Sequence, residues 1–480
     1  MDIKEGLTFD DVLLIPKRSP VMSRKEVSVE TWLTAKIKLN IPIVSANMDT
    51  VTESAMAIAI ARQGGIGIIH RFLPIEKQVE EVLKAKRSES FIIEQPVTIN
   101  QAKSLKDARQ LMTYLDVGGI IVIDDNEDIS GILTTRDILF QENPKIKVSE
   151  IMTKKSDLIT APYGITLDEA KKILSDNRIE KLPLLDGSGK LKGLITTKDI
   201  SKKEKYPVAS KDIKGRLLVG AAVGVKDDYI ERATSLYRAG CDVLVVDIAH
   251  GHSDIAIKAI KEIRKNLGSI PIIAGNVATA EGTKDLIKAD VDCVKAGVGG
   301  GSICITRIVT GAGVPQLTAI MECAKIAQKE SIPIIADGGI RNSGDLTKAL
   351  AAGASSGMLG NLLAGTEESP GVIIMRQGKR YKIYRGMASF EANLKRKQKQ
   401  NNNFEIDTDL LDMTPEGVES LVAYKGYTSE IIMQLINGLK SGVSYCGAKN
   451  IRELQKNAEF IKMSPAGLRE SYPHDVDVLK

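Results

Sequence analysis

Short apolar runs rich in β-branched residues recur along the chain, and stretches with helical spacing of apolar residues separate them. Most of these runs end in small or polar residues and lead directly into a helical stretch. Eight runs are predicted strands: 41–46, 66–70, 217–223, 243–247, 271–275, 293–297, 332–337 and 357–360. The helices predicted between them are 53–62, 227–238, 253–266, 280–289, 319–329 and 343–352.

This alternation predicts an α/β fold, a parallel (β/α)8 barrel, in preference to an open sheet. The runs are apolar throughout, which is typical of strands that are covered on both faces. In such a barrel the chemistry lies on the loops that follow the carboxyl ends of the strands. The loop after the sixth predicted strand, which contains a lone cysteine, is therefore expected on the functional rim.

One segment interrupts the alternation between the second and third strands. The pattern of Leu105–Ala108 recurs at Leu167–Ala170, and two further pairs of similar segments are separated by the same 62 residues. Chance rarely produces such a repeat. Polar linkers are expected near Lys84–Glu89 and Lys202–Lys211. We therefore predict barrel residues 1–90 and 206–480 with a tandem α+β module, residues 91–205, inserted between them.

The loop after the sixth strand carries four glycines within Gly297–Gly301 and then Cys304. Glycine allows tight turns and lets the backbone approach a ligand closely. A cysteine there is a candidate nucleophile, with Arg307 as a cation that favours the thiolate and Thr306 as a group that could pass a proton. The alternative is a flexible surface loop with an incidental thiol.

Other strand ends carry polar or glycine residues that point to the same rim. Asp337 closes the seventh strand and is suited to a sugar diol, and Gly360–Asn361 follows the eighth, where this fold often holds phosphate. Asp247 ends the fourth strand as a second candidate contact. His250 and His252 lack a third ligand nearby in sequence, so we do not predict a metal pair there.

Composition narrows the class of protein. The 480 residues carry a formal net charge of +5, which is no nucleic-acid signature at this length, and the basic block Lys395–Lys399 is interpreted as a solvated loop. Five scattered cysteines without a Cys-x-x-Cys pair indicate a reducing compartment. The chain shows no signal peptide and no apolar run long enough to span a bilayer. We expect a soluble, cytoplasmic protein without nucleic-acid or membrane partners.

A set of motifs together resembles the family of inosine-5′-monophosphate (IMP) dehydrogenase and guanosine-5′-monophosphate (GMP) reductase, over nearly the whole chain. The motifs are Leu7–Val12, Asn47–Val51, Gly220–Gly224, Asp247–Ser253, Gly275–Val277, Gly297–Arg307, Ala336–Arg341, Tyr384–Met387 and Glu416–Gly417. The fold expected from spacing and the fold that this resemblance implies agree.

The tandem repeat resembles a pair of cystathionine-β-synthase (CBS) modules. Such modules commonly bind adenine nucleotides and regulate an attached domain, and here an adenine or guanine nucleotide is the expected ligand. Thr135 and Asp137, with Thr197 and Asp199 in the second copy, match positions that often hold ribose and phosphate in that family. A module that folds but binds nothing is the alternative.

The family resemblance implies a purine mononucleotide substrate and a covalent mechanism. The Cys304 thiolate would add to purine C2, hydride would pass between C2 and a nicotinamide, and Thr306 and Glu391 would assist catalysis. The implied substrate contacts are Ser302, Asp337, Gly339, Gly360, Asn361, Tyr384, Met387, Ala388 and Glu416. The implied cofactor contacts are Asp247, Asn276 and Gly297. Carbonyls of Gly299, Gly301 and Cys304 would bind potassium or another monovalent cation, although Gly300 replaces a common proline.

The sequence departs from the dehydrogenase pattern in the flap, residues 388–414, which lacks the Arg-Tyr pair that normally activates water. Asn47 also resembles the reductase pattern, whereas the length of the flap and Ser464–Asp475 resemble dehydrogenases. Glu391 is displaced by one place from the usual acidic residue of reductases, and Asn361 replaces a common serine.

These departures favour a GMP reductase that uses NADPH to convert GMP to IMP and ammonia. The first alternative is an IMP dehydrogenase that uses NAD and another flap base, such as Arg396. The second alternative is a nucleotide sensor with weak catalysis whose output comes from the CBS pair. The resemblance implies a homotetramer, or an octamer paired through the CBS modules.

Overall fold

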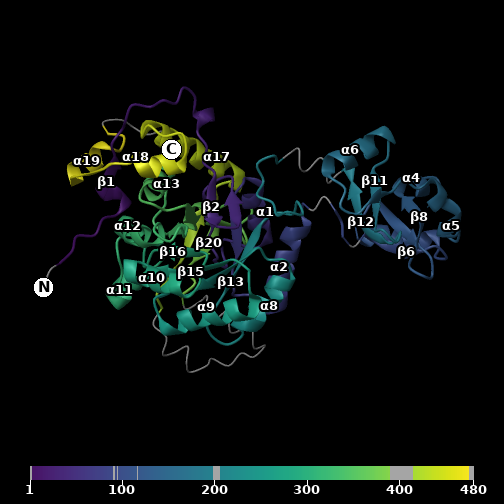
Figure 1. The fold of residues 1–480 in the computed structure, drawn as a ribbon, viewed down its shortest axis with the longest axis horizontal. Coiled ribbons are helices and arrows are strands. Elements are labelled where there is room, and N and C mark those ends of the chain that lie inside the picture. The colour runs from purple at the N-terminus through teal and green to yellow at the C-terminus, as the bar shows by residue number, and fades with distance from the viewer. Residues whose placement is uncertain are drawn as a thin grey trace. The chain divides into compact units, whose positions relative to one another are not determined.

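The computed structural model describes residues 3–89, 92–94, 96–115, 117–197, 200, 206–389 and 415–474. The chain divides into two compact units (Figure 1). The first comprises Met1–Ser88, Val208–Asp212 and Leu217–Lys480, and the second comprises Glu89–Pro207 and Ile213–Arg216. The second unit is therefore an insertion within the first.

Eight parallel strands close into a barrel in the first unit, and strands that follow one another in the barrel's sequence order lie side by side. The predicted (β/α)8 fold is confirmed, and each predicted strand overlaps an observed one. The strands are β4 (Ile43–Ser45), β5 (Ile66–Ile69), β13 (Val219–Val223), β14 (Val243–Asp247), β15 (Ile272–Val277), β16 (Cys293–Ala296), β17 (Ile334–Asp337) and β18 (Ser356–Leu359). Almost every residue of these strands is buried, which explains why the runs lack alternation.

Helices surround the barrel because each presents an apolar stripe to the strands. In α9, for example, Ala256, Ala259, Ile260 and Ile263 are buried at helical spacing. The surrounding helices are α1 (Ser54–Arg62), α2 (Ile75–Arg87), α8 (Tyr229–Arg238), α9 (Asp254–Leu267), α10 (Ala280–Lys288), α12 (Gln316–Ala327), α13 (Ser343–Ala351) and the short α14 (Asn361–Ala364).

The linker predicted at residues 84–89 is wrong for its first four residues, which form the last turn of α2. Val82 and Ala85 face the core, and the Lys86 side chain is buried. Lys86 Nζ lies 2.6 Å from Asp242 Oδ2 and 3.1 Å from Asp212 Oδ2. In sequence, the charged residues of this stretch resemble a solvated linker. In the fold, carboxylates from distant segments neutralise the lysine, so it can be buried.

Several elements outside the repeating pattern were not predicted. Strand β1 pairs antiparallel with β22, so the two terminal regions meet beside the barrel (Figure 1). Helix α17 packs on α13, where a Cβ on Gly442 would lie 2.7 Å from Thr347 Cγ2. These elements are β1 (Val12–Leu14), β2 (Thr31–Thr34), β3 (Ile37–Leu39), β19 (Ile374–Arg376), β20 (Lys379–Arg385), β21 (Glu419–Ala423), β22 (Phe460–Lys462), α17 (Thr428–Tyr445), α18 (Ile451–Asn457) and α19 (Pro465–Glu470).

The inserted unit contains two similar halves. Helix α3 (Leu105–Tyr114) and strands β7 (Gly119–Ile123) and β8 (Ile129–Thr134) recur 62 residues later as α6 (Leu167–Asp176), β11 (Lys181–Leu185) and β12 (Leu191–Thr196). Both helices start with a capping box, from Ser104 and Thr166. The first half adds β6 (Thr98–Asn100), α4 (Thr135–Ile138), α5 (Val148–Ile151) and β9 (Thr153–Lys154), and the second adds β10 (Ala161–Pro162). Position 199, a predicted nucleotide contact, lies outside the described residues.

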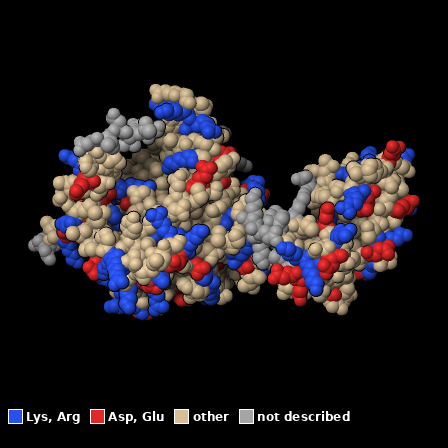
Figure 2. Space-filling view, turned by 90° about the horizontal axis from the view of Figure 1, so that it is seen from above, with Lys and Arg blue, Asp and Glu red and all other residues tan. Residues whose placement is uncertain are grey.

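No helix among the described residues is both long enough and apolar enough to cross a membrane. On the face shown in Figure 2, lysine and arginine are interspersed with aspartate and glutamate in both units.

Candidate active site

The loop that follows β16 is held in place by Arg307, at the start of α11 (Thr306–Thr310). Its guanidinium donates to the Val298 carbonyl (3.0 Å) and the Val314 carbonyl (2.5 Å). Gly313 has φ +156°, and a Cβ there would lie 2.5 Å from Arg307 Cγ, so glycine leaves room for the arginine side chain. Arg307 was expected beside the thiol, but its guanidinium is engaged with the loop backbone and gives the loop its shape.

The Cys304 thiol lies at the start of a short chain of polar groups. Cys304 Sγ is 3.1 Å from Thr306 Oγ1, and the Thr306 hydroxyl donates to Glu416 Oε2 at 2.7 Å. The geometry gives the thiol a carboxylate proton acceptor through one hydroxyl, which is the arrangement of an activated nucleophile. The contact of Glu416 with the purine base stays a prediction.

Backbone pairing brings Glu416 to the cysteine although the two are far apart in sequence. Ile305 N donates to the Glu416 carbonyl at 2.9 Å, and Val418 N donates to the Ile303 carbonyl at 3.1 Å. Gly417 permits this approach, since a Cβ there would lie 3.2 Å from the Cα of Gly386. The segment before β21 therefore fixes one side of the cysteine loop.

Tyr384, Ser302 and Gly360 meet in the same region, as the predicted substrate contacts require. Burial raises the pKa of Tyr384 to about 12, a hydrogen bond with Ser302 opposes that rise, and the charges of Asp337 and Cys304 add to it. A Cβ on Gly360 would lie 2.8 Å from the Tyr384 hydroxyl oxygen. The phenol therefore stays protonated and can donate to a bound phosphate or sugar.

Carboxylates from two barrel strands flank a buried lysine beneath this region. Lys295 Nζ, on β16, lies 3.0 Å from Asp247 Oδ1 and 2.7 Å from Asp337 Oδ2. Asn276 Nδ2 donates to Asp337 Oδ2 (2.9 Å) and to the Gly297 carbonyl (2.7 Å). Lys295 thus joins the predicted contacts Asp247 and Asp337, and the Asn276 amide joins Asp337 to Gly297.

Burial by itself raises the pKa of Asp247, but the positive charges of Lys295 and Arg71 and hydrogen bonds from Lys295 and Asn47 outweigh it and leave the pKa lowered. Sequence reasoning missed Lys295, although a lysine inside the apolar run 291–296 was a visible signal. The sequence indicates only that Asn47 matches the reductase pattern, whereas in the structure its side chain forms a hydrogen bond with Asp247.

Comparison with known proteins identifies the family. The family model described as "IMP dehydrogenase / GMP reductase domain" matches residues 6–474. This chain belongs to the IMP dehydrogenase/GMP reductase family. It is therefore an oxidoreductase, and the family uses NAD(P)(H) as its cofactor. The expectation from motifs is confirmed at this level.

Relatives of both activities match nearly the whole chain. Inosine-5′-monophosphate dehydrogenase of Nitrosopumilus maritimus is 58% identical over 99% of both chains, that of Aquifex aeolicus is 56% identical over 100% of this chain and 97% of its own, and that of Bacillus subtilis is 52% identical over 99% and 97%. A GMP reductase variant of Trypanosoma brucei in complex with guanosine 5′-monophosphate matches with a TM-score of 0.91, 45% identity and 99% coverage of both chains. The same enzyme with guanosine 5′-triphosphate matches with a TM-score of 0.80, 42% identity and coverage of 96% and 98%.

The remaining predicted residues of this family member are placed as follows. Gly339 has φ +78° and packs against Phe9, since a Cβ would lie 3.3 Å from Phe9 Cε2. Asn361 begins α14, and its carbonyl accepts from Lys425 Nζ at 2.9 Å. Met387 Sδ accepts from the Asp49 N–H at 3.4 Å, and the Ala388 carbonyl accepts from Glu416 N at 3.0 Å.

Other predictions remain without a geometric test. Residue 391 and most of the flap lie outside the described residues. In the part of the chain that the structure describes, no group of three or more His, Cys, Asp or Glu residues is arranged to hold a metal ion, and His252 instead lies 3.1 Å from Asp285. The carbonyl site for a monovalent cation stays a prediction.

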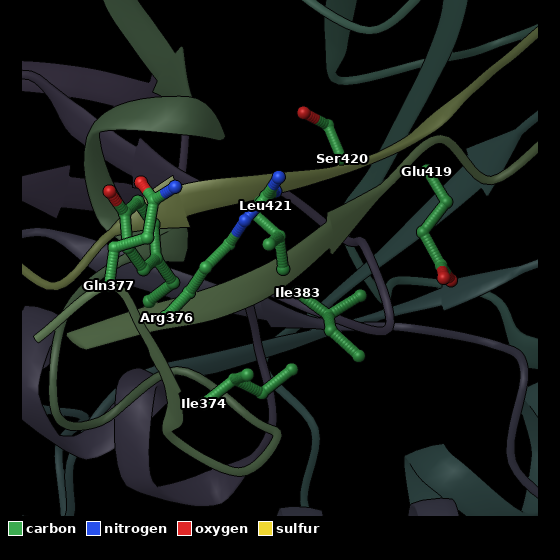
Figure 3. A pocket seen from close by; sticks show the side chains of 8 residues that line it. Ile374, Arg376, Gln377, Ile383, Glu419, Ser420 and Leu421 are labelled. Carbon is green, nitrogen blue, oxygen red and sulfur yellow. The ribbon is translucent and has the colours of Figure 1, made fainter. Parts of the chain in front are cut away.

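A hollow of 670 Å³ lies on the sheet formed by β19, β20 and β21. Its lining residues are Ile374, Arg376, Gln377, Tyr381, Ile383, Glu419, Ser420 and Leu421 (Figure 3), and none is a predicted site residue. Glu419 pairs with Arg385 at 3.2 Å, and Arg385 pairs with Asp49 at 2.7 Å. These ion pairs tie the strands on either side of the flap to the loop after β4.

Proposed function

We propose that this enzyme oxidises IMP at C2 with NAD to give xanthosine monophosphate, through a covalent adduct on Cys304. The observation that carries the chemistry is the contact of Cys304 with Thr306 and of Thr306 with Glu416. The relatives of 52–58% identity, all named as IMP dehydrogenases over nearly their full length, favour this direction. The preference for a reductase drawn from the sequence alone therefore becomes the second candidate.

In the proposed reaction the Cys304 thiol loses its proton through Thr306 to Glu416, and the sulfur bonds to purine C2. Nicotinamide, when bound, accepts the hydride that leaves C2. Water then attacks C2 and the C–S bond breaks, so the thiolate is restored and one proton is released. The sequence lacks the Arg-Tyr pair that normally activates water, which speaks against a dehydrogenase. Glu416 is a carboxylate close to the sulfur that could take the proton from water in place of that pair.

The residues present fit a purine nucleotide and a dinucleotide. Asn276 Oδ1 is buried and accepts no hydrogen bond from the described residues, so it can receive one from a sugar hydroxyl or a carboxamide. Asp337 and Asp247 offer carboxylates for ribose diols, and Tyr384 and Ser302 offer hydroxyls for phosphate. Carbonyls of the glycine loop would hold a monovalent cation.

The second candidate is GMP reduction with NADPH, which releases ammonia. It is favoured by the flap sequence without an Arg-Tyr pair and by Asn47, whose side chain bonds Asp247. The likeness to the Trypanosoma brucei reductase in complex with GMP is compatible with it. In this direction the same Thr306–Glu416 pair would protonate the leaving amine.

We also propose that the inserted unit is a pair of CBS modules that bind an adenine or guanine nucleotide, and that the enzyme is a homotetramer. The matching halves of the insertion support the first proposal. Asp137, a predicted contact there, accepts from Thr134 N and Thr134 Oγ1, each at 2.7 Å, so its Oδ2 caps α4.

Absorbance of the reduced nicotinamide tests the direction of the reaction. Purified enzyme is given IMP, NAD and potassium in one experiment and GMP with NADPH in another, with Cys304→Ala as the control. We expect steady NADH formation that depends on IMP and on Cys304. Consumption of NADPH that depends on GMP, without turnover of IMP, would replace the dehydrogenase by the reductase.

A further inference from the structure

Lys295 is an unusual residue for the inside of a barrel strand. Its side chain is 3% exposed, and it sits on β16 opposite Gly275 of β15. A Cβ on Gly275 would lie 2.6 Å from Lys295 Cβ. The absence of a side chain at Gly275 therefore makes room for the lysine side chain. An ammonium in this position is stable only if it is paired, because its removal from water costs several kcal/mol.

The two partners of Lys295 are more exposed than the lysine itself. The Asp247 and Asp337 side chains are 18% and 22% exposed. The amine therefore lies beneath, and the carboxylates lie closer to the solvent at the carboxyl ends of β14 and β17. Lys295 and Asn276 both donate to Asp337 Oδ2, so Asp337 Oδ1 is the oxygen left for a ligand.

The amine also balances a local excess of negative charge. Burial lowers the pKa of Lys295, but the charges of Asp247 and Asp337 outweigh burial and leave the pKa raised, so the amine stays charged. Arg71 faces Asp247, and Tyr384 lies near both Asp337 and Cys304. Without the amine, two like charges would face each other: the distance between Asp247 Oδ1 and Asp337 Oδ2 is at most the sum of their distances to Lys295 Nζ, which are 3.0 Å and 2.7 Å.

We propose that Lys295 is a positioning residue that fixes Asp247 and Asp337 together, so that one buried cation sets the ribose contacts of both the purine nucleotide and the dinucleotide. This inference rests on the proposed function, because it takes a purine nucleotide as the ligand of Asp337. Lys295 itself does not reach the reacting atoms; it acts through the two carboxylates.

Calorimetric titration with IMP tests this role without catalysis. For Lys295→Met we expect the Kd for IMP to rise about 10- to 100-fold, the range for loss of one or two hydrogen bonds to a charged group. One of the two facing carboxylates should then take up a proton. The IMP phosphate itself takes up a proton in this range, with a second pKa of about 6, so the wild-type Kd sets the baseline at each pH. Relative to that baseline, binding by the variant should weaken further from about pH 8 to about pH 5.5.

The control is Lys288→Met, which removes an exposed lysine 3.1 Å from Asp285 and should bind IMP as the wild type does. Should Lys295→Met fail to fold, Asp247→Asn/Lys295→Met restores the charge balance. This double variant should bind IMP at least about tenfold more weakly than Asp247→Asn alone, because Asp337 has lost its amine. It should not show acid-side weakening beyond that of the wild type, because only one carboxylate remains.

The outcomes separate this inference from the proposed function. A folded Lys295→Met protein that binds IMP with the wild-type Kd at every pH would overturn the positioning role and leave the function intact. An affinity loss that is the same at every pH in Lys295→Met, and absent from the double variant relative to Asp247→Asn, would also overturn it. A wild-type protein that does not bind IMP would overturn the proposed function and this inference with it.

Discussion

The hydrogen bond between Thr306 and Glu416 makes the substitution Glu416→Gln the most informative one in the site. Glutamine keeps the shape and an acceptor oxygen for the Thr306 hydroxyl, now 2.7 Å from Glu416 Oε2, but it cannot take a proton. We expect kcat to fall about 10²- to 10⁴-fold, the range for a general base. That equals about 2.7–5.4 kcal/mol of transition-state stabilisation, at about 1.36 kcal/mol per factor of ten.

The size of the loss separates two roles of Glu416. Loss of a charge-assisted hydrogen bond alone is worth about 1.5–3 kcal/mol, or about 10- to 150-fold. A larger fall in kcat with little change in KM indicates proton transfer. Rapid-mixing measurement of NADH shows which step is slowed: an intact first turnover followed by slow cycling places Glu416 in hydrolysis, and a slow first turnover places it in activation of Cys304.

Glu419→Gln is the matched control, because Glu419 pairs with Arg385 at 3.2 Å and lines the neighbouring hollow (Figure 3). It should change kcat less than about threefold, as expected for a partly exposed ion pair. Thr306→Val should match Glu416→Gln, and the double variant should be no slower than either, since the residues act as a unit. A Glu416→Gln enzyme within about fivefold of the wild type, or multiplicative losses in the double variant, would refute the relay.

Two further predictions concern stability. Lys86→Met should lower the free energy of unfolding of the barrel unit by about 3–5 kcal/mol, because it removes the buried cation that pairs with Asp242. Lys77→Met, at an exposed pair, should change it by less than about 1 kcal/mol. Urea midpoints followed by fluorescence of the lone tryptophan compare the two. Glu127 has φ +63° at the position where the second half of the insertion has Gly189, at φ +80°. Gly189→Glu should therefore destabilise the inserted unit by about 1 kcal/mol, and Glu127→Gly should be neutral or stabilising. Amide hydrogen exchange of residues 96–197 measures both changes in stability, and equal effects would contradict strain from the left-handed backbone.

Local pattern determined much of this protein. The strands are apolar because both faces are covered, so the runs themselves predict a barrel of parallel strands, and the offset of 62 residues predicts the two halves of the insertion. The glycine loop and Cys304 were identifiable because the loop directly follows a predicted barrel strand, which is where this fold places its chemistry, and Cys304 is the one thiol on it. The family followed from motifs with fixed spacing.

Only the tertiary structure decided which distant residues complete the site. Glu416 reaches Thr306 through backbone pairing between segments 110 residues apart, and Lys295 gains its meaning from carboxylates on two other strands. The last turn of α2 resembles a linker in sequence because it is charged. It packs against the barrel because aspartates far along the chain neutralise the charge of Lys86. Sequence pattern records which face of an element is apolar, whereas pairing of buried charges depends on contacts that local pattern does not contain.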